Sequence, residues 1–145
     1  VLPVRHEVSR SARVRGTPGE VYRLLRNVAQ GPSWRSGLIR VEVLGNAAGR
    51  ERFREIGKDG TILYEIEEDD PPRRLVTRIA DESLPFGGSW TYELSPCPDG
   101  TELRITERGE VRNPIFRALS RFVFGHTANL DRYLADVERK QAGIS

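Results

Sequence analysis

Residues 113–143 read NPIFRALSRFVFGHTANLDRYLADVERKQAG and predict one long helix, Pro114 to Gln141. Asn113 suits the N-cap, proline suits the first helical position, and Gly143 follows the last periodic residue. Such a helix would be about 40 Å long. Its apolar residues recur at helical spacing and form one stripe: Ile115, Phe116, Leu119, Phe122, Val123, Leu130, Tyr133, Leu134 and Val137. His126 lies at the centre of this stripe in projection, so the helix is expected to cover an apolar surface with an imidazole in the middle of the contact.

The rest of the chain predicts a sheet. Thr17, Pro18 and Glu20 form a capping box that starts a short helix, and Gln30 to Gly37 is a break or one further turn that carries Trp34. Alternating or apolar segments separated by turn residues predict seven strands: Val4–Arg15, Leu38–Leu44, Arg50–Ile56, Thr61–Glu68, Arg74–Ala80, Gly88–Ser95 and Thr101–Arg112. Short connections between successive strands favour antiparallel pairing.

A sheet with one apolar face needs a cover, and the C-terminal helix is the only predicted element long enough to provide it. The pattern therefore predicts an α+β fold, with residues 1–145 forming a single domain in which a curved antiparallel sheet wraps around the long helix. The sequence does not decide which face of the strand Arg50–Ile56 points inward, because Phe53 favours one face and Ile56 the other. Gly45–Gly49 is expected to be a hairpin loop.

Composition narrows the class of protein. Hydrophobic residues make up 37% and charged residues 30%, which is typical of a globular protein, and no apolar run approaches the roughly 20 residues of a membrane span. No signal-peptide pattern begins the sequence, and the single Cys97 excludes an internal disulfide, which favours the cytoplasm.

Charge is segregated along the chain. The segment up to Arg54 contains eleven arginines and four acidic residues. The segment from Glu55 to Val111 contains fourteen acidic and six basic residues. Because the arginines alternate with apolar residues, most are expected on solvated faces. Nucleic-acid binding is therefore not expected, and small-molecule binding is favoured.

The order of elements resembles the START-like, or SRPBCC, superfamily of polyketide cyclases and lipid-transfer domains. The likeness rests on Thr17–Tyr22 after the first strand, Trp34 before the second, Gly88–Leu94 followed by Asp99–Leu103, and the long final helix. The resemblance implies the helix-grip fold, with seven strands in spatial order 1-7-6-5-4-3-2 and one or two short helices between strands 1 and 2. It also implies a cavity between sheet and final helix, in which most members bind hydrophobic ligands and some act as cyclases, aromatases or hydrolases. The family has no universal catalytic motif.

The candidate ligand-binding residues combine inner-face aromatic residues with the helix stripe: Tyr64, Trp90, Tyr92, Leu119, Phe122, Val123, His126 and Leu130. Aromatic residues at strand spacing are usually core, but in a fold with a cavity the core and the cavity wall are one surface. His126 and Glu107 are the candidates for proton transfer, although either could be satisfied structurally instead.

Glu107 lies on the apolar face of the last strand, and His6 and Arg10 lie on that of the first. If these strands pair, a His6–Glu107 or an Arg10–Glu107 pair would neutralise the buried carboxylate without any catalysis, and this structural interpretation is the favoured one.

The sequence contains no motif typical of metal binding, nucleophilic catalysis or nucleotide binding. Two histidines and one cysteine, far apart in sequence, do not have metal-ligand spacing, and no nucleophile elbow, phosphate loop or dinucleotide fingerprint is present, so neither metal nor cofactor is expected. Apolar residues in the loop Asp81–Gly87, Leu84-Pro85-Phe86, suit a lid, and with the loop Gly45–Gly49 they could fringe a cavity entrance.

Three hypotheses follow. The first is a cytoplasmic protein, monomeric or homodimeric and without stable membrane insertion, that binds a hydrophobic small molecule such as an aromatic polyketide, lipid or isoprenoid. The second is an enzyme of the cyclase or aromatase kind that uses His126 and Glu107. The third is a protein-interaction module that uses the arginine-rich N-terminal half. Whether the protein is an enzyme is not decided by the sequence.

Overall fold

The computed structural model describes residues 4–111 and 128–143. In chain order its elements are β1 (Val4–Val14), α1 (Pro18–Arg26), the 3-10 helix η1 (Val28–Ser33), β2 (Leu38–Ala47), β3 (Arg50–Gly57), β4 (Gly60–Asp70), β5 (Arg74–Ile79), β6 (Phe86–Cys97), β7 (Gly100–Val111) and α3 (Ala128–Gln141). The first part of the predicted C-terminal helix, residues 114–127, lies outside the described residues.

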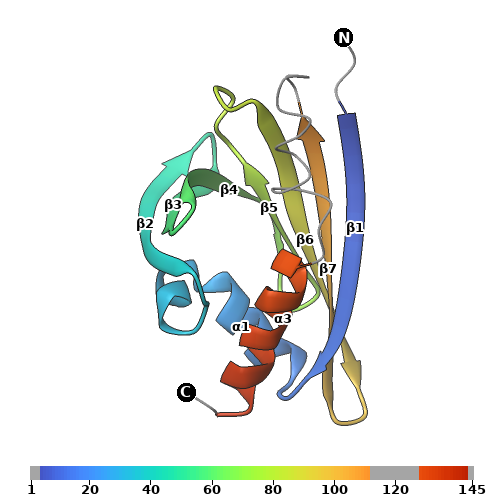
Figure 1. The fold of residues 1–145 in the computed structure, drawn as a ribbon. Coiled ribbons are helices and arrows are strands. Elements are labelled where there is room, and N and C mark those ends of the chain that lie inside the picture. The colour runs from blue at the N-terminus through green and yellow to red at the C-terminus, as the bar shows by residue number, and fades with distance from the viewer. Residues whose placement is uncertain (1–3, 112–127, 144–145) are drawn as a thin grey trace.

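The strands form one seven-stranded sheet in the order β1-β7-β6-β5-β4-β3-β2, as the START-like resemblance implies. All neighbouring strands are antiparallel, and the first strand pairs with the last, so that β1 and β2 are the two edges of the sheet. Figure 1 shows that the sheet curves so that β2 and β1 lie on opposite sides of α3, with α1 at the same end of the sheet. The predicted α+β helix-grip fold is therefore confirmed.

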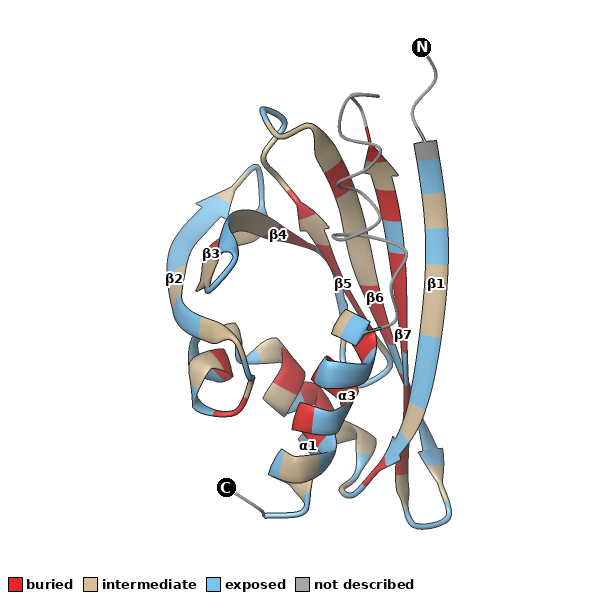
Figure 2. Ribbon diagram, viewed as in Figure 1, coloured by how far each residue is buried: buried red, intermediate tan, exposed pale blue. Residues whose placement is uncertain are grey.

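The core lies where α1 and α3 meet the inner face of the sheet. Val21 of α1, Leu103 and Ile105 of β7, and Leu130 and Val137 of α3 are completely buried. Figure 2 shows buried residues on these elements, whereas the edge strands β1 and β2 carry few. Burial of these side chains supplies the main driving force for docking the helices on the sheet.

The start of α1 and the end of α3 lie where the capping residues in the sequence predict them. The hydroxyl of Thr17 accepts a hydrogen bond from the backbone N–H of Glu20, which confirms the predicted cap of α1. At the other end, α3 stops at Gln141, and Gly143 adopts a φ of 75°, a conformation that glycine tolerates best. None of the helices in the described ranges is long and apolar enough to cross a bilayer.

The β2–β3 hairpin corrects the prediction of a loop at Gly45–Gly49. Strand β2 continues to Ala47, and the turn consists of Ala48 and Gly49, whose φ angles are 53° and 79°. Two successive positive φ angles are typical of a two-residue type I′ turn. The pairing shifts between Val43 and Gly45, so Gly45 belongs to an irregularity inside the strand and not to a loop.

The inward face of β3, which the sequence left open, is that of Phe53. This side chain is 2% exposed and stacks on Tyr64 of β4 with ring centroids 5.5 Å apart. Glu55, two residues further along the strand, faces the same side. Because Glu55 is acidic although it faces inward, apolar and polar residues do not alternate regularly along β3.

The outer face of the sheet joins the basic and acidic segments of the chain. Glu65 of β4 is 3% exposed because arginines of neighbouring strands cover it, at 2.9 Å from Arg50, 3.4 Å from Arg52 and 2.7 Å from Arg78. The hydrogen bond from Arg78 is the main reason that the pKa of Glu65 lies below its usual value. Glu65 is therefore buried on the outer face of the sheet by charged groups and not by apolar ones.

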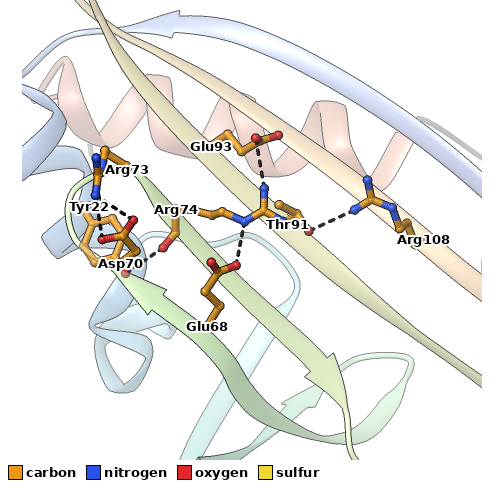
Figure 3. Close-up of polar contacts among 8 residues, drawn as sticks. All are labelled: Tyr22, Glu68, Asp70, Arg73, Arg74, Thr91, Glu93 and Arg108. Atoms are coloured by element: carbon orange, nitrogen blue, oxygen red, sulfur yellow. Dashed lines mark hydrogen bonds and ion pairs between the residues drawn. The ribbon is translucent and has the colours of Figure 1, made fainter.

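Figure 3 shows the same arrangement further along this face, where Arg74 reaches Glu68 on one side and Glu93 on the other. The pairs of Arg74 lie within the acidic part of the chain. The pairs of Arg50 and Arg52 with Glu65 connect the basic part to the acidic part, because antiparallel pairing places β3 beside β4.

A buried carboxylate attaches α3 to the segment before β2. Asp136, 3% exposed, accepts hydrogen bonds at 2.9 Å from both the backbone N–H and the hydroxyl of Ser36. Arg139 donates to Asp136 at 2.6 Å and to the carbonyl of Trp34 at 3.2 Å. Burial alone would raise the pKa of Asp136, but the hydrogen bonds from Ser36 and Arg139 outweigh it and hold the pKa below its usual value.

We predict that Asp136→Asn lowers the free energy of unfolding by about 2 kcal/mol near pH 7, because it removes a charged acceptor of buried hydrogen bonds. The folded pKa of Asp136 is depressed, so its contribution is complete above the ordinary pKa of about 4 and is lost as the pH falls through the lower, folded value. The difference between wild type and variant should therefore narrow in urea unfolding near pH 3. Asp131→Asn is the matched control, because this aspartate of α3 is 56% exposed in its side chain. A difference that stays constant on acidification would contradict the prediction.

Candidate functional site

A cavity of about 760 Å³ lies between the inner face of the sheet and α3. Its described lining comes from the segment before β2, from the six strands β2 to β7, from the β3–β4 turn, from the loop before β6 and from α3. It includes Glu55, Lys58, Asp59, Ile62, Tyr64, Ile79, Leu84, Phe86, Trp90, Glu107, Asn129, Arg132 and Tyr133. This volume falls in the range typical of sites for small molecules.

A recess of about 50 Å³ adjoins the cavity at the end covered by α1 and η1. Its wall includes Leu25 and Val28 from the helical side, Tyr92 from β6, and Trp34. The residues that line both spaces mark the boundary between them: Arg35, Glu55, Tyr64, Trp90 and Tyr133. A ligand in the cavity would therefore meet these five side chains at its inner end.

Arg35 and Glu55 form a paired charge at this boundary. The guanidinium donates to both carboxylate oxygens, at 2.7 Å and 3.3 Å, and the two side chains are 22% and 19% exposed. The guanidinium also lies 5.0 Å from the centre of the Tyr133 ring, a cation–π distance. Burial opposes the charge of Arg35, but the carboxylate of Glu55 raises the pKa of Arg35 above its usual value. The pair therefore places two opposite charges in the site, and together they add no net charge.

Aromatic rings surround this pair. Tyr133 of α3 lies 5.4 Å from Trp34, 5.4 Å from Trp90 and 5.7 Å from Tyr92, measured between ring centroids. Burial raises the pKa of Tyr133 to about 12 and also raises the pKa values of Tyr64 and Tyr92. All three hydroxyls therefore keep their protons at neutral pH and can donate hydrogen bonds to a ligand.

Glu107 of β7 places a carboxyl group in the cavity wall. It is 4% exposed, and its Oε2 accepts a hydrogen bond from Nε1 of Trp90 at 2.8 Å. Nε2 of His6 lies 3.5 Å from the other oxygen. Of the two pairings that the sequence allowed, the structure thus contains His6–Glu107, while Arg10 instead lies 3.5 Å from Asp131 of α3. A carboxyl group beside an imidazole can accept and return protons.

The structure brings only part of the predicted site together. Tyr64, Trp90 and Glu107 line the cavity, and Tyr92 lines the recess. Leu130 is buried in the core and is not among the described lining residues. Leu119, Phe122, Val123 and His126 lie outside the described residues. Leu84 and Phe86 of the predicted lid loop do line the cavity, whereas the described lining contains no residue of Gly45–Gly49.

Sequence reasoning missed the Arg35–Glu55 pair. Glu55 follows Phe53 at strand spacing, and this was the available signal that a charged residue faces inward. Arg35 lies in the irregular segment after η1, where no periodicity indicates its direction. Within residues 4–111 and 128–143, no three His, Cys, Asp or Glu side chains are grouped as they would be to hold a metal ion.

A second hollow, of about 600 Å³, is lined by residues of β1, β4, β5, β6 and β7 and shares Ile79, Gly88, Ser89 and Arg108 with the first cavity. Charged residues and glycines dominate it, with Arg5, Glu7, Arg108 and Glu110 among them. It lacks the tryptophan and tyrosine side chains of the first cavity. The cavity under α3 is therefore the better candidate for a ligand site.

We predict that Glu55→Gln lowers the free energy of unfolding by about 2 kcal/mol, because it leaves the guanidinium of Arg35 partly buried without its counter-charge. The double variant Arg35→Met/Glu55→Leu should recover most of this loss, since neither charge then remains to be desolvated. Glu42→Gln is the control, because it breaks an ion pair with Arg54 whose side chains are 39% and 40% exposed. Equal effects of Glu55→Gln and Glu42→Gln in urea unfolding would contradict the prediction.

Comparison with known proteins finds one family whose model matches this sequence. Residues 5–139 match the model of a family described as polyketide cyclase / dehydrase and lipid transport. No protein of curated function has a sequence that matches the chain.

Solved structures share its architecture at low sequence identity. A START superfamily protein from Mycobacterium smegmatis has a TM-score of 0.78 and 16% identity, and the alignment covers 97% of this chain and 99% of that one. Norcoclaurine synthase from Thalictrum flavum has a TM-score of 0.77 and 10% identity, with 99% and 98% covered. The di-domain ARO/CYC protein StfQ of the steffimycin biosynthetic pathway has a TM-score of 0.73 and 16% identity, and this chain spans 52% of its length.

At these identities the solved structures show a common fold, and the family match covers nearly the whole chain. The chain therefore belongs to the polyketide cyclase/dehydrase and lipid transport family and has the START-like helix-grip fold.

Proposed function

We propose that this protein binds a hydrophobic small molecule, such as an aromatic polyketide, a lipid or an isoprenoid, in the cavity between the sheet and α3. The observation that carries the proposal is the cavity of about 760 Å³, with Ile62, Phe86 and Trp90 in its wall. Transfer of an apolar ligand from water to such a wall is worth about 25 cal/mol per Å² buried. The description of the family supports this class of ligand.

The arrangement of the lining suits an apolar ligand with some polar character. Most apolar and aromatic side chains come from the sheet, which also contributes Glu55 and Glu107. Further charged residues come from the β3–β4 turn and from α3, as Lys58, Asp59 and Arg132 do. Apolar burial would provide the affinity, and a small number of polar contacts would orient the ligand.

Native mass spectrometry of the purified protein, followed by extraction, tests the proposal. We expect a co-purified hydrophobic molecule, or a 1:1 complex with an added one such as 1-anilinonaphthalene-8-sulfonate or a fatty alcohol. Ile62→Trp should abolish the complex, because the indole would occupy the cavity from the inner face of β4.

Leu63→Trp provides the matched control. Leu63 is the next residue of β4, so its side chain points to the other face of the sheet, and the variant should bind as the wild type does. Failure of all probes to bind the folded wild-type protein, or equal binding by Ile62→Trp, would contradict the proposal.

A second candidate function, an enzyme of the cyclase or aromatase kind, is favoured by one observation. Glu107 is a buried carboxyl group in the cavity wall, held by Trp90 and close to His6. In such a reaction the carboxylate would take a proton from a carbon next to a carbonyl, and the enolate would attack a second carbonyl. The proton would then return to the new alkoxide. His126, the other candidate for proton transfer, lies outside the described residues.

Exchange of the C1 hydrogens of 2-tetralone for deuterium, followed by mass spectrometry, tests this proton transfer. If Glu107 is the base, Glu107→Gln should reduce the protein-dependent exchange rate by about 100-fold while 2-tetralone still binds. Glu102→Gln, an exposed position on the same strand, should leave the rate unchanged. No protein-dependent exchange, or the same rate in Glu107→Gln, would leave binding alone as the function.

The arginine-rich half provides no comparable observation for an interaction module. Its residues are largely paired with acids, as Arg26 is with Glu51 and Asp69, and as Arg54 is with Glu42. Balanced charge of this kind supports small-molecule binding over a nucleic-acid surface. A cytoplasmic location and the oligomeric state stay predictions from the sequence.

A further inference from the structure

Trp34 provides a hydrogen-bond donor that no described residue satisfies. The residue is 7% exposed, lines the recess, and has no partner for its Nε1 within residues 4–111 and 128–143. Its position is well supported: its carbonyl accepts a hydrogen bond from Arg139, and its ring meets Tyr133 edge-on. A buried N–H without an acceptor is costly, so a ligand that supplied one would gain from it.

Tyr64 provides a second donor at the same place. It lines both the recess and the cavity, and its ring is held by stacking on Phe53. Burial raises its pKa, so the hydroxyl stays protonated at neutral pH. The recess wall therefore contains two donors, Trp34 and Tyr64, and the second of them also lines the cavity.

The charges at this boundary favour a neutral ligand group. Arg35 is already matched by Glu55 through two hydrogen bonds, so the pair offers no excess positive charge to an anion. Glu107 adds a further carboxyl group to the wall. A ligand carboxylate would lose its hydration without gaining a counter-charge, whereas a neutral carbonyl oxygen needs donors alone.

We propose that Trp34 and Tyr64, beside the Arg35–Glu55 pair, form a subsite that binds a neutral carbonyl oxygen of the ligand. The apolar body of the ligand then lies in the larger cavity, and its ketone, aldehyde or ester end faces the recess. This inference rests on the proposed binding function and names the polar group that the site selects.

Three probes of one shape test it: 2-acetylnaphthalene, 2-ethylnaphthalene and 2-naphthoate. We expect the acetyl compound to bind about 25-fold more tightly than the ethyl compound, which corresponds to about five-fold for each of the two hydrogen bonds, and the carboxylate to bind most weakly. Titration calorimetry on the complete chain measures these ratios.

The preference should depend on the two donors. Tyr64→Phe and Trp34→Phe should each bring the acetyl-to-ethyl ratio toward one, with binding of 2-ethylnaphthalene largely retained. Tyr22→Phe removes the hydroxyl of a tyrosine in α1 that donates to Asp69 and lines neither the cavity nor the recess, so its ratio should match the wild type.

Indole N–H signals in an ¹⁵N–¹H spectrum give a readout on the unmodified protein, since the chain has two tryptophans. The signal of Trp34 should shift downfield with 2-acetylnaphthalene and not with 2-ethylnaphthalene. The signal of Trp90, already bonded to Glu107, should change less.

Equal affinities for the acetyl and ethyl compounds, with no selective shift of the Trp34 signal, would overturn the inference and leave the proposed function intact. Tightest binding of 2-naphthoate would overturn it by showing an anion site. Absence of binding by all three probes would count against the proposed function itself.

Discussion

The attachment of α3 through Asp136 is the interaction on which the rest of the site depends. It connects the last helix to Ser36, and Arg139 extends the connection to the carbonyl of Trp34. Arg139 and Asp136 are three residues apart in α3, but Ser36 and the carbonyl of Trp34 are about 100 residues away, so those contacts form only when α3 docks on this segment. Once α3 is held there, Tyr133 lies over the inner end of the cavity, against Trp34, Trp90 and Tyr92.

The inner end of the cavity combines an aromatic boundary with one pair of opposite charges, Arg35 and Glu55. Tyr133 packs edge-on against Trp34 and Trp90, and two hydrogen bonds to Glu55 hold the guanidinium of Arg35 beside these rings. A polar pair whose hydrogen bonds are mutual is tolerated in such a place, where an unpaired charge would not be. The described wall of the cavity thus combines apolar and aromatic side chains with charged ones, among them the carboxyl group of Glu107 on β7.

Strand pairing explains how the chain can be so unevenly charged in sequence and so evenly charged in space. The basic β3 lies beside the acidic β4, and Glu65 is buried under arginines of both neighbouring strands. The arginines therefore cover the outer face of the sheet while their charges are neutralised there. The inner face stays available for the helices and the cavity.

The amino-acid pattern alone determined the seven strands, the cap of α1 at Thr17 and the end of α3, because alternation and capping are local properties of the backbone. It also indicated that Tyr64, Trp90 and Glu107 face inward. Only the tertiary structure decided the inward face of β3, the burial of Glu65 and the pairing of His6 with Glu107. The reason is that a buried polar side chain is stabilised by partners from other strands, and the sequence of one strand does not show which residues will lie beside it in the folded protein.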